Sequence, residues 1–302
     1  MKHKMTLFRI VLVIIGSICL SPVSQAKEFF YNITTSTTKG VYKNSIHRDS
    51  LTEAAVSLTA EYLDKGGVTV GYGKTLIQMK PDDVNDVDLE QHHRYVSGRI
   101  NTWPEELNGR VTLRLDGHYV SNNDPLGDTS GVIVLAPQMS WTSLDDNIYY
   151  DLGYANSKYP NQLSITQVTG TMGLGFNDGA DWFQLRGYQI RGLNPARAAN
   201  KTSTLSWEMK ITHHFASRAA LVPSYFSITG MSGERAFAVD MDALSVANIA
   251  DLSNGSASLL LGWDINVAAN FSLLVGNSSY RDVNAKTNYA LNYVYGSLTL
   301  KW

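Results

Sequence analysis

A chain of 302 residues with 25 Lys and Arg against 27 Asp and Glu has a formal charge of −2, which excludes the strongly basic footprint of a nucleic-acid-binding protein. Its 24 glycines and 16 tyrosines accompany an apolar–polar alternation of period two, which favours β-strands over helices. The single cysteine, Cys19, excludes a disulfide framework.

Residues 1–26 are predicted to be a secretory signal peptide that is removed from the mature chain. Basic residues precede an apolar run over residues 10–20, and the small residues Ser24 and Ala26 provide a cleavage site. The apolar run is too short for a membrane-spanning helix. Cleavage removes three basic residues, no acidic residue and the only cysteine, so the charge falls from −2 to −5. We therefore expect an exported single domain over residues 27–302.

The mature chain is predicted to consist of about fourteen β-strands, with 12 or 16 strands as the alternatives. Residues 255–267 show the pattern most clearly, because Leu259, Leu261 and Trp263 share one face and polar residues occupy the other. The predicted strands span 28–37, 52–63, 67–79, 87–102, 109–121, 131–143, 147–157, 162–176, 181–192, 202–215, 219–230, 255–267, 270–281 and 287–302.

The connections between the predicted strands alternate in length. Short turns are expected at 64–66, 144–146 and 268–269, whereas longer loops are expected at 38–51 and 231–254. A β-sandwich has no reason to alternate in this way. A transmembrane β-barrel does, because its turns are short on the periplasmic side and its loops are longer outside.

Aromatic residues support the same architecture. On the apolar face, they recur next to the short-turn ends of the predicted strands, which is typical of the girdle at a membrane interface. The last residue of the chain is one of them, so the final strand is expected to bury one face to its end. The predicted girdle consists of Phe29, Tyr62, Trp141, Phe176, Phe183, Phe215, Phe271 and Trp302.

The terminal segment YVYGSLTLKW (residues 293–302), the signal peptide and the strand–turn alternation together resemble the outer-membrane β-barrels of Gram-negative bacteria. In size the chain is similar to the monomeric fourteen-stranded porins. The resemblance implies a multi-pass barrel in the outer membrane with both termini in the periplasm. It also implies contact with outer-membrane lipid and lipopolysaccharide, and recognition of the C-terminal strand by the barrel-assembly machinery.

The interior of such a barrel is predicted to be polar. Fourteen tilted strands leave a lumen of roughly 15 Å once side chains are allowed for. Charged side chains at inward positions require water or close pairing, because they would be costly against lipid. The predicted pore-lining residues are His93, Arg99, Arg110, Arg114, Asp116, His118, Asp151, Arg186, Glu208, Lys210 and Asp264.

Two parts of the predicted lumen have open interpretations. Within the long loop, residues 241–252 have apolar residues at near-helical spacing, which indicates either a short helix that folds into the mouth or a surface loop. Arg99, Arg110 and Arg114 either form a basic patch that attracts anions or pair with Asp116 and Glu61 and brace the wall.

No catalytic or cofactor site is predicted. His118 and Ser121 are three residues apart, so they face opposite sides of a strand and cannot form a nucleophile–base pair there. His93 is expected roughly opposite His118, with Asp116 nearby, which suggests either a metal or anion site or, as we prefer, a hydrated wall. Phosphate-binding, zinc and calcium motifs are absent from the sequence. We therefore expect no enzymatic activity, no cofactor and no metal.

The expected function is a pore for passive or weakly selective passage of small hydrophilic solutes. The alternative is a closed barrel that serves as a scaffold, with surface loops that bind or adhere or with a docked periplasmic partner.

Overall fold

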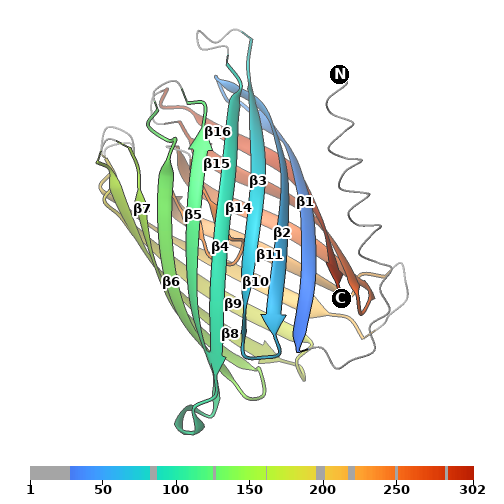
Figure 1. The fold of residues 1–302 in the computed structure, drawn as a ribbon. Helices are drawn as coiled ribbons and strands as arrows, with labels where there is room; N and C mark the ends of the chain where they lie inside the picture. Colours follow the sequence, from blue (N-terminus) through green and yellow to red (C-terminus); the bar gives the residue numbers. More distant parts are fainter. Residues whose placement is uncertain are drawn as a thin grey trace.

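The computed structural model describes residues 28–81, 87–124, 127–160, 162–194, 201–216, 222–248, 251–282 and 285–302, so the predicted signal peptide lies outside the described residues. The described chain forms a closed antiparallel barrel of fourteen strands (Figure 1). The predicted fold class and strand number are therefore confirmed.

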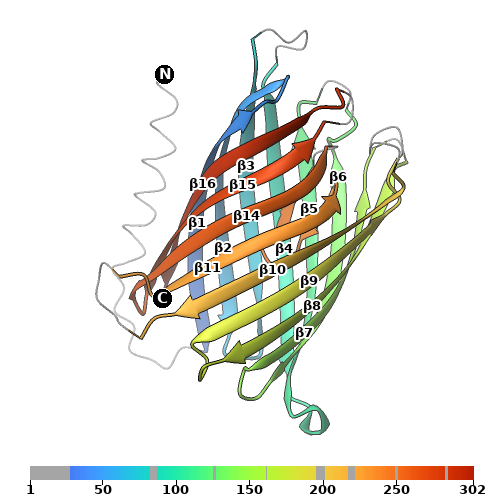
Figure 2. The same cartoon turned by 180° about the vertical axis from the view of Figure 1, so that it is seen from behind.

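The strands follow one another around the barrel in sequence order, and a small hairpin is inserted between two of them (Figure 2). The barrel strands are β1 (Phe29–Lys43), β2 (Arg48–Tyr62), β3 (Gly66–Met79), β4 (Leu89–Thr102), β5 (Gly109–Asn122), β6 (Val132–Ser143), β7 (Ile148–Lys158), β8 (Ser164–Phe176), β9 (Asp181–Arg191), β10 (Ser203–His214), β11 (Tyr225–Arg235), β14 (Leu252–Asn266), β15 (Ala269–Arg281) and β16 (Asn288–Lys301). The inserted hairpin consists of β12 (Val239–Asp240) and β13 (Ser245–Val246).

Helical structure is limited to a 3-10 turn, Glu105–Leu107, in the part of the chain that the structure describes. Within that part, no helix combines the length and the apolar character needed to cross a membrane.

The barrel closes through the first and last strands, which pair along almost their whole length. Asn32 lies opposite Lys301, and the register continues to Lys43 opposite Ala290. The backbone N–H and C=O of Trp302 bond to the C=O and N–H of Tyr31 at 3.0 Å. Because every strand has two neighbours, no strand edge is left open, as a membrane-spanning sheet requires.

The outer surface of the barrel is apolar. Alternate residues point outward, and on β5 Leu113 and Leu115 are each 51% exposed while the intervening strand positions turn inward. Large exposed apolar side chains occur in this way on every barrel strand except β9, whose outward Phe183 and Leu185 are partly exposed. An apolar band of this kind around a closed barrel is expected where the surrounding medium is lipid, so the fold is that of a transmembrane β-barrel.

The predicted girdle residues all lie on this outward face, at the end of the barrel that carries the turns 63–65, 144–147, 177–180 and 267–268. We call this the short-turn end. Phe29 packs beside Tyr62 at a ring-centroid distance of 5.0 Å, and Trp302 lies 6.1 Å from the ring of Tyr31. Whether this ring of aromatics meets the periplasmic interface stays a prediction.

Three of the predicted strands have wrong boundaries. β1 continues to Lys43 and β2 begins at Arg48, so the predicted long loop 38–51 is a short connection. β11 spans Tyr225–Arg235, whereas the sequence predicts this strand at 219–230. Pro223 has no N–H to donate to a sheet, which delays the start of that strand. The predicted three-residue turn after β10 is therefore a longer connection.

Candidate pore and its internal hairpin

The connection from β11 to β14 folds into the barrel, and its described residues 236–248 and 251 are called the lumen hairpin. Neither of the two alternatives for residues 241–252, a short helix or a surface loop, is found among the described residues: β12, a turn at 241–244 and β13 form a hairpin inside the barrel. A carboxylate oxygen of Asp240 accepts hydrogen bonds from the backbone N–H groups of Asp242 and Ala243, each at 3.0 Å. These bonds close a turn where helix formation would have had to begin.

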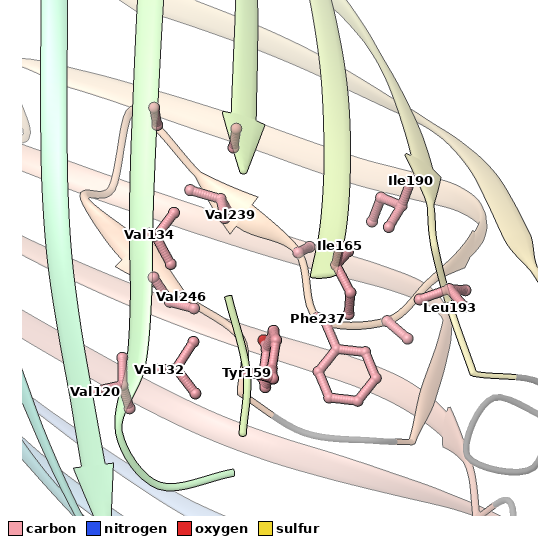
Figure 3. Packing of buried hydrophobic residues seen from close by; sticks show 14 of the residues in the cluster. Val120, Val132, Val134, Tyr159, Ile165, Ile190, Leu193, Phe237, Val239 and Val246 are labelled. Atoms are coloured by element: carbon pink, nitrogen blue, oxygen red, sulfur yellow. The ribbon is translucent and has the colours of Figure 1, made fainter. Parts of the chain in front are cut away.

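Apolar side chains hold the hairpin against one side of the lumen (Figure 3). Phe237 and Val239 are each 1% exposed, and the ring of Phe237 meets that of Tyr159 edge-on at 5.0 Å. Their partners are inward-facing residues at the long-loop ends of β5 to β9. The cluster consists of Val120, Val132, Val134, Ala136, Ala155, Tyr159, Ile165, Ile190, Leu193, Ala236, Phe237, Ala238, Val239, Met241, Val246 and Leu252.

Polar side chains of the wall bond to the hairpin backbone. The amide of Gln167 accepts a bond from the N–H of Val239 at 3.0 Å and donates one to its C=O at 2.7 Å. The guanidinium of Arg114 donates to the C=O of Met241. At the far end of the hairpin, Arg48 and Asp251 form an ion pair at 2.6 Å. The hairpin is therefore fixed to the wall along its length rather than lying loosely in the lumen.

Arg186 joins the tip of the hairpin to the wall. Its guanidinium lies 2.6 Å from Asp242 of the hairpin and 3.6 Å from Asp151 of β7, and it also donates to Thr171 at 2.7 Å. The side chains of Arg186 and Asp151 are 4% and 0% exposed. Tyr149 donates a further hydrogen bond to Asp151 at 2.9 Å. Each buried charge thus has an oppositely charged partner.

We expect Arg186→Met to lower the free energy of unfolding by about 3–5 kcal/mol, because it leaves the carboxylate of Asp151 buried without a cation. Arg99→Met is the matched control. Its pair with Glu61 is 2.9 Å long but 44% and 32% exposed, so we expect a loss of about 1 kcal/mol or less. Urea titration of the refolded protein in lipid vesicles measures both losses. Equal losses would contradict the structural role assigned to Arg186.

The opposite side of the lumen is not covered by the hairpin. Several inward residues of β1, β2 and β14 to β16, among them Ser36, Ser57 and Ser258, stay partly exposed, whereas inward residues of β5 to β9 are mostly buried. Although Asp242 binds the buried Arg186, its own side chain is 46% exposed. Water therefore reaches the tip of the hairpin from the uncovered side, and the hairpin narrows the lumen without filling it.

The structure places all the predicted pore-lining residues on the inward face, but it separates them into two groups. Under or beside the hairpin lie Arg114, Asp116, His118, Asp151 and Arg186. Glu208 and His93 lie next to this group, and the remaining residues are partly or fully exposed on the inward face: Arg99, Arg110, Lys210 and Asp264.

The predicted basic patch is largely neutralised by ion pairs. Arg99 pairs with Glu61 at 2.9 Å, and Arg114 pairs with Asp116 at 2.8 Å. Among the described residues, Arg110 has no ion pair within 4 Å. Arg99 and Arg114 therefore pair with acidic residues and brace the wall, as the second alternative predicts, whereas Arg110 does not.

His93 and His118 lie together, although the strand register sets His93 opposite Val120 and His118 opposite Tyr95. Nε2 of His93 is 3.0 Å from Nδ1 of His118, and their rings stack at 5.2 Å. No group of three or more His, Cys, Asp or Glu side chains in the described ranges is arranged to hold a metal ion.

The sequence predicts Arg114 and Arg186 as pore-lining residues but does not single out the other residues that fix the hairpin. Arg48 lies in a predicted loop, and Gln167 is a neutral residue in a strand with many polar inward positions. The one usable signal was the position of Gln167 on the inward face beside the apolar Ile165, where a buried amide requires a partner.

No protein-family model matches this sequence, and no curated protein is significantly similar to it. Solved structures with a similar fold include the CymD monoaromatic hydrocarbon channel, with 7% identity over 92% of this chain and 89% of that chain and a TM-score of 0.56. A TodX deltaS2S3 mutant monoaromatic hydrocarbon channel has 8% identity over 92% of this chain and 91% of that chain, with a TM-score of 0.54. A bacterial polysaccharide outer membrane secretin has 11% identity over 90% and 98%, with a TM-score of 0.52. The shared feature is the barrel fold, and identities this low define no substrate.

Proposed function

We propose that this protein is an outer-membrane pore for the passive passage of small hydrophilic solutes. The observation that carries the proposal is the exposure of Asp242, because its carboxylate is 46% exposed deep inside a closed barrel. A space that hydrates this carboxylate also admits small polar solutes. The path runs between the lumen hairpin and the inward faces of β1, β2 and β14 to β16, so it is narrower than an empty barrel of fourteen strands.

The proposal includes the location of the protein and its surroundings. The short-turn end with both chain termini would face the periplasm, and the barrel-assembly machinery would recognise the C-terminal strand. Lys39, Lys74 and Arg94 point outward in the half of the barrel that carries the longer loops. The anionic groups of lipopolysaccharide would meet these cations there, which supports that orientation.

Uptake into vesicles tests the proposed passage. Proteoliposomes should swell rapidly in neutral polyethylene glycols of the smallest mass, and the rate should fall steeply as the mass increases, because the hairpin limits the gap. Vesicles without protein give the baseline. Swelling at that baseline for every solute, from a correctly folded barrel, would favour the scaffold function instead.

We further expect the pore to become more cation-selective when Arg99 and Arg110 are both replaced with Ser. Together with Arg114, they oppose two carboxylates, Glu61 and Asp116, so the local charge changes from +1 to −1. Arg114 is kept, because it holds the hairpin and balances a buried acid. Screening limits the effect to about 8 Å at 0.15 M salt, so it should grow at low salt.

Reversal potentials under a salt gradient measure this change. Arg94→Ser is the matched control, since it removes a cation from the lipid-facing side of the same strand as Arg99. An unchanged potential in a conducting double variant would show that this part of the wall lies outside the ion path.

A further inference from the structure

Tyrosine side chains line the part of the lumen that the hairpin leaves uncovered. The rings belong to β4, β11, β15 and β16, and each is only partly buried. They extend from the long-loop ends of β15 and β16, through the middle of β16, to the short-turn end of β11. We call this set the tyrosine track, and it consists of Tyr95, Tyr225, Tyr280, Tyr293 and Tyr295.

Three of these rings lie flat against the wall. The ring of Tyr95 occupies the space that a Cβ on Gly71 would need, at 2.1 Å, and the ring of Tyr225 does the same at Gly262, at 2.2 Å. Tyr293 similarly covers Gly276 of the neighbouring strand, at 2.5 Å. Each ring therefore rests against the backbone of the neighbouring strand, on the lumen side of the wall.

Several charged groups near the track form ion pairs. Arg235 lies 3.8 Å from Glu208, and Asp242 pairs with Arg186. The lumen thus combines aromatic ring faces with hydrogen-bond donors and acceptors of both charges.

This combination selects among solutes that bind aromatic faces. A hydrocarbon would make no hydrogen bonds to the charged groups, and it would have to displace the water that hydrates them. An organic cation would find two rings outside the track already occupied, because the guanidinium of Arg48 lies 5.4 Å from the ring of Tyr289 and 5.9 Å from that of Tyr42 at the long-loop end. A saccharide has apolar C–H faces that stack on rings and hydroxyl edges that bond to carboxylates and guanidinium groups.

We propose that the tyrosine track is a binding path for saccharide chains. The rings hold successive sugar units by their faces, and the paired charges across the lumen bond to the hydroxyl edges. This inference rests on the proposed pore function and specifies its substrate class.

Interruption of the ion current by maltohexaose tests the track. We expect this neutral sugar to block the single-channel current of the unaltered protein for longer than a polyethylene glycol of equal mass. In a Tyr293→Ala, Tyr295→Ala double variant, the residence time should fall by about tenfold or more, as expected when two stacking contacts are lost. The matching double change to Phe keeps both rings and should retain most of the residence time. Tyr150→Ala, which removes an outward-facing ring that is 51% exposed, should have no effect.

Equal block by maltohexaose and polyethylene glycol would overturn the inference, and so would an unchanged residence time in the double Ala variant. Stronger block by choline would identify a cation site and also overturn it. Calorimetric titration of the refolded protein with maltohexaose separates this inference from the pore function. Binding by a barrel that does not conduct would retain the track and refute the pore, whereas conductance without binding would retain the pore and refute the track.

Discussion

Replacing residues 237–248 with a short Gly-Ser linker is expected to raise the single-channel conductance severalfold. The hairpin covers the inward faces of β5 to β9 and brings Asp242 into the lumen. Without it, the path widens toward the roughly 15 Å available in a barrel of fourteen strands. The ion pair of Arg186 and Asp151 remains after the replacement, so the wall keeps its charge balance.

The replacement exposes apolar wall residues such as Val134 and Ile165 to water, so its folding must be checked by heat-dependent mobility in gels. Replacing the turn 144–146 with the same linker is the control, because that turn lies outside the lumen. A folded variant with unchanged conductance would show that the hairpin does not stand in the ion path.

Deleting Trp302 is expected to prevent assembly of most of the barrel. The residue makes two backbone hydrogen bonds to Tyr31 across the closing seam, each worth about 1 kcal/mol net, and its ring stacks on that of Tyr31. In the function proposed above, it also forms part of the C-terminal strand that the barrel-assembly machinery would recognise. We expect the shortened chain to accumulate unfolded in the periplasm and to be degraded there.

Fractionation of cells that express each variant measures the assembled protein. Trp302→Phe keeps an aromatic ring and both backbone bonds, so it should assemble at close to the normal level. If the deletion variant reached the outer membrane as a heat-modifiable barrel in normal amounts, the closing role of Trp302 would be refuted.

Most of the barrel could be predicted because a two-residue period leaves a direct mark on the sequence. Leu259, Leu261 and Trp263 alternate with polar residues, and the structure has them on one outward face of β14. The prediction of strand boundaries failed where the outward face loses its apolar character. Lys39 occupies an outward position of β1. Because a charged residue there interrupts the apolar pattern, the pattern predicts that the strand ends before Lys39.

The lumen hairpin could not be predicted because distant residues determine its form. Val246 and Leu252 belong to a set of apolar residues with near-helical spacing in the sequence, but their partners are Val120, Val134 and other residues of strands far along the chain. Gln167 fixes the backbone of Val239 across 72 positions. Local periodicity carries no information about such contacts.

The same limit applies to the charged lumen. Inward parity correctly indicated which charges face the interior, but it could not tell the exposed pair of Arg99 and Glu61 from the buried pair of Arg186 and Asp151. That distinction depends on where the hairpin lies.

Single-channel recording of the unaltered protein in a planar lipid bilayer tests the central claim most directly. We predict stepwise insertion events, each adding a uniform conductance that is small for a barrel of this size because the hairpin narrows the path. A heat-modifiable, fully folded barrel that inserts without any conductance step would contradict the pore and leave a closed scaffold.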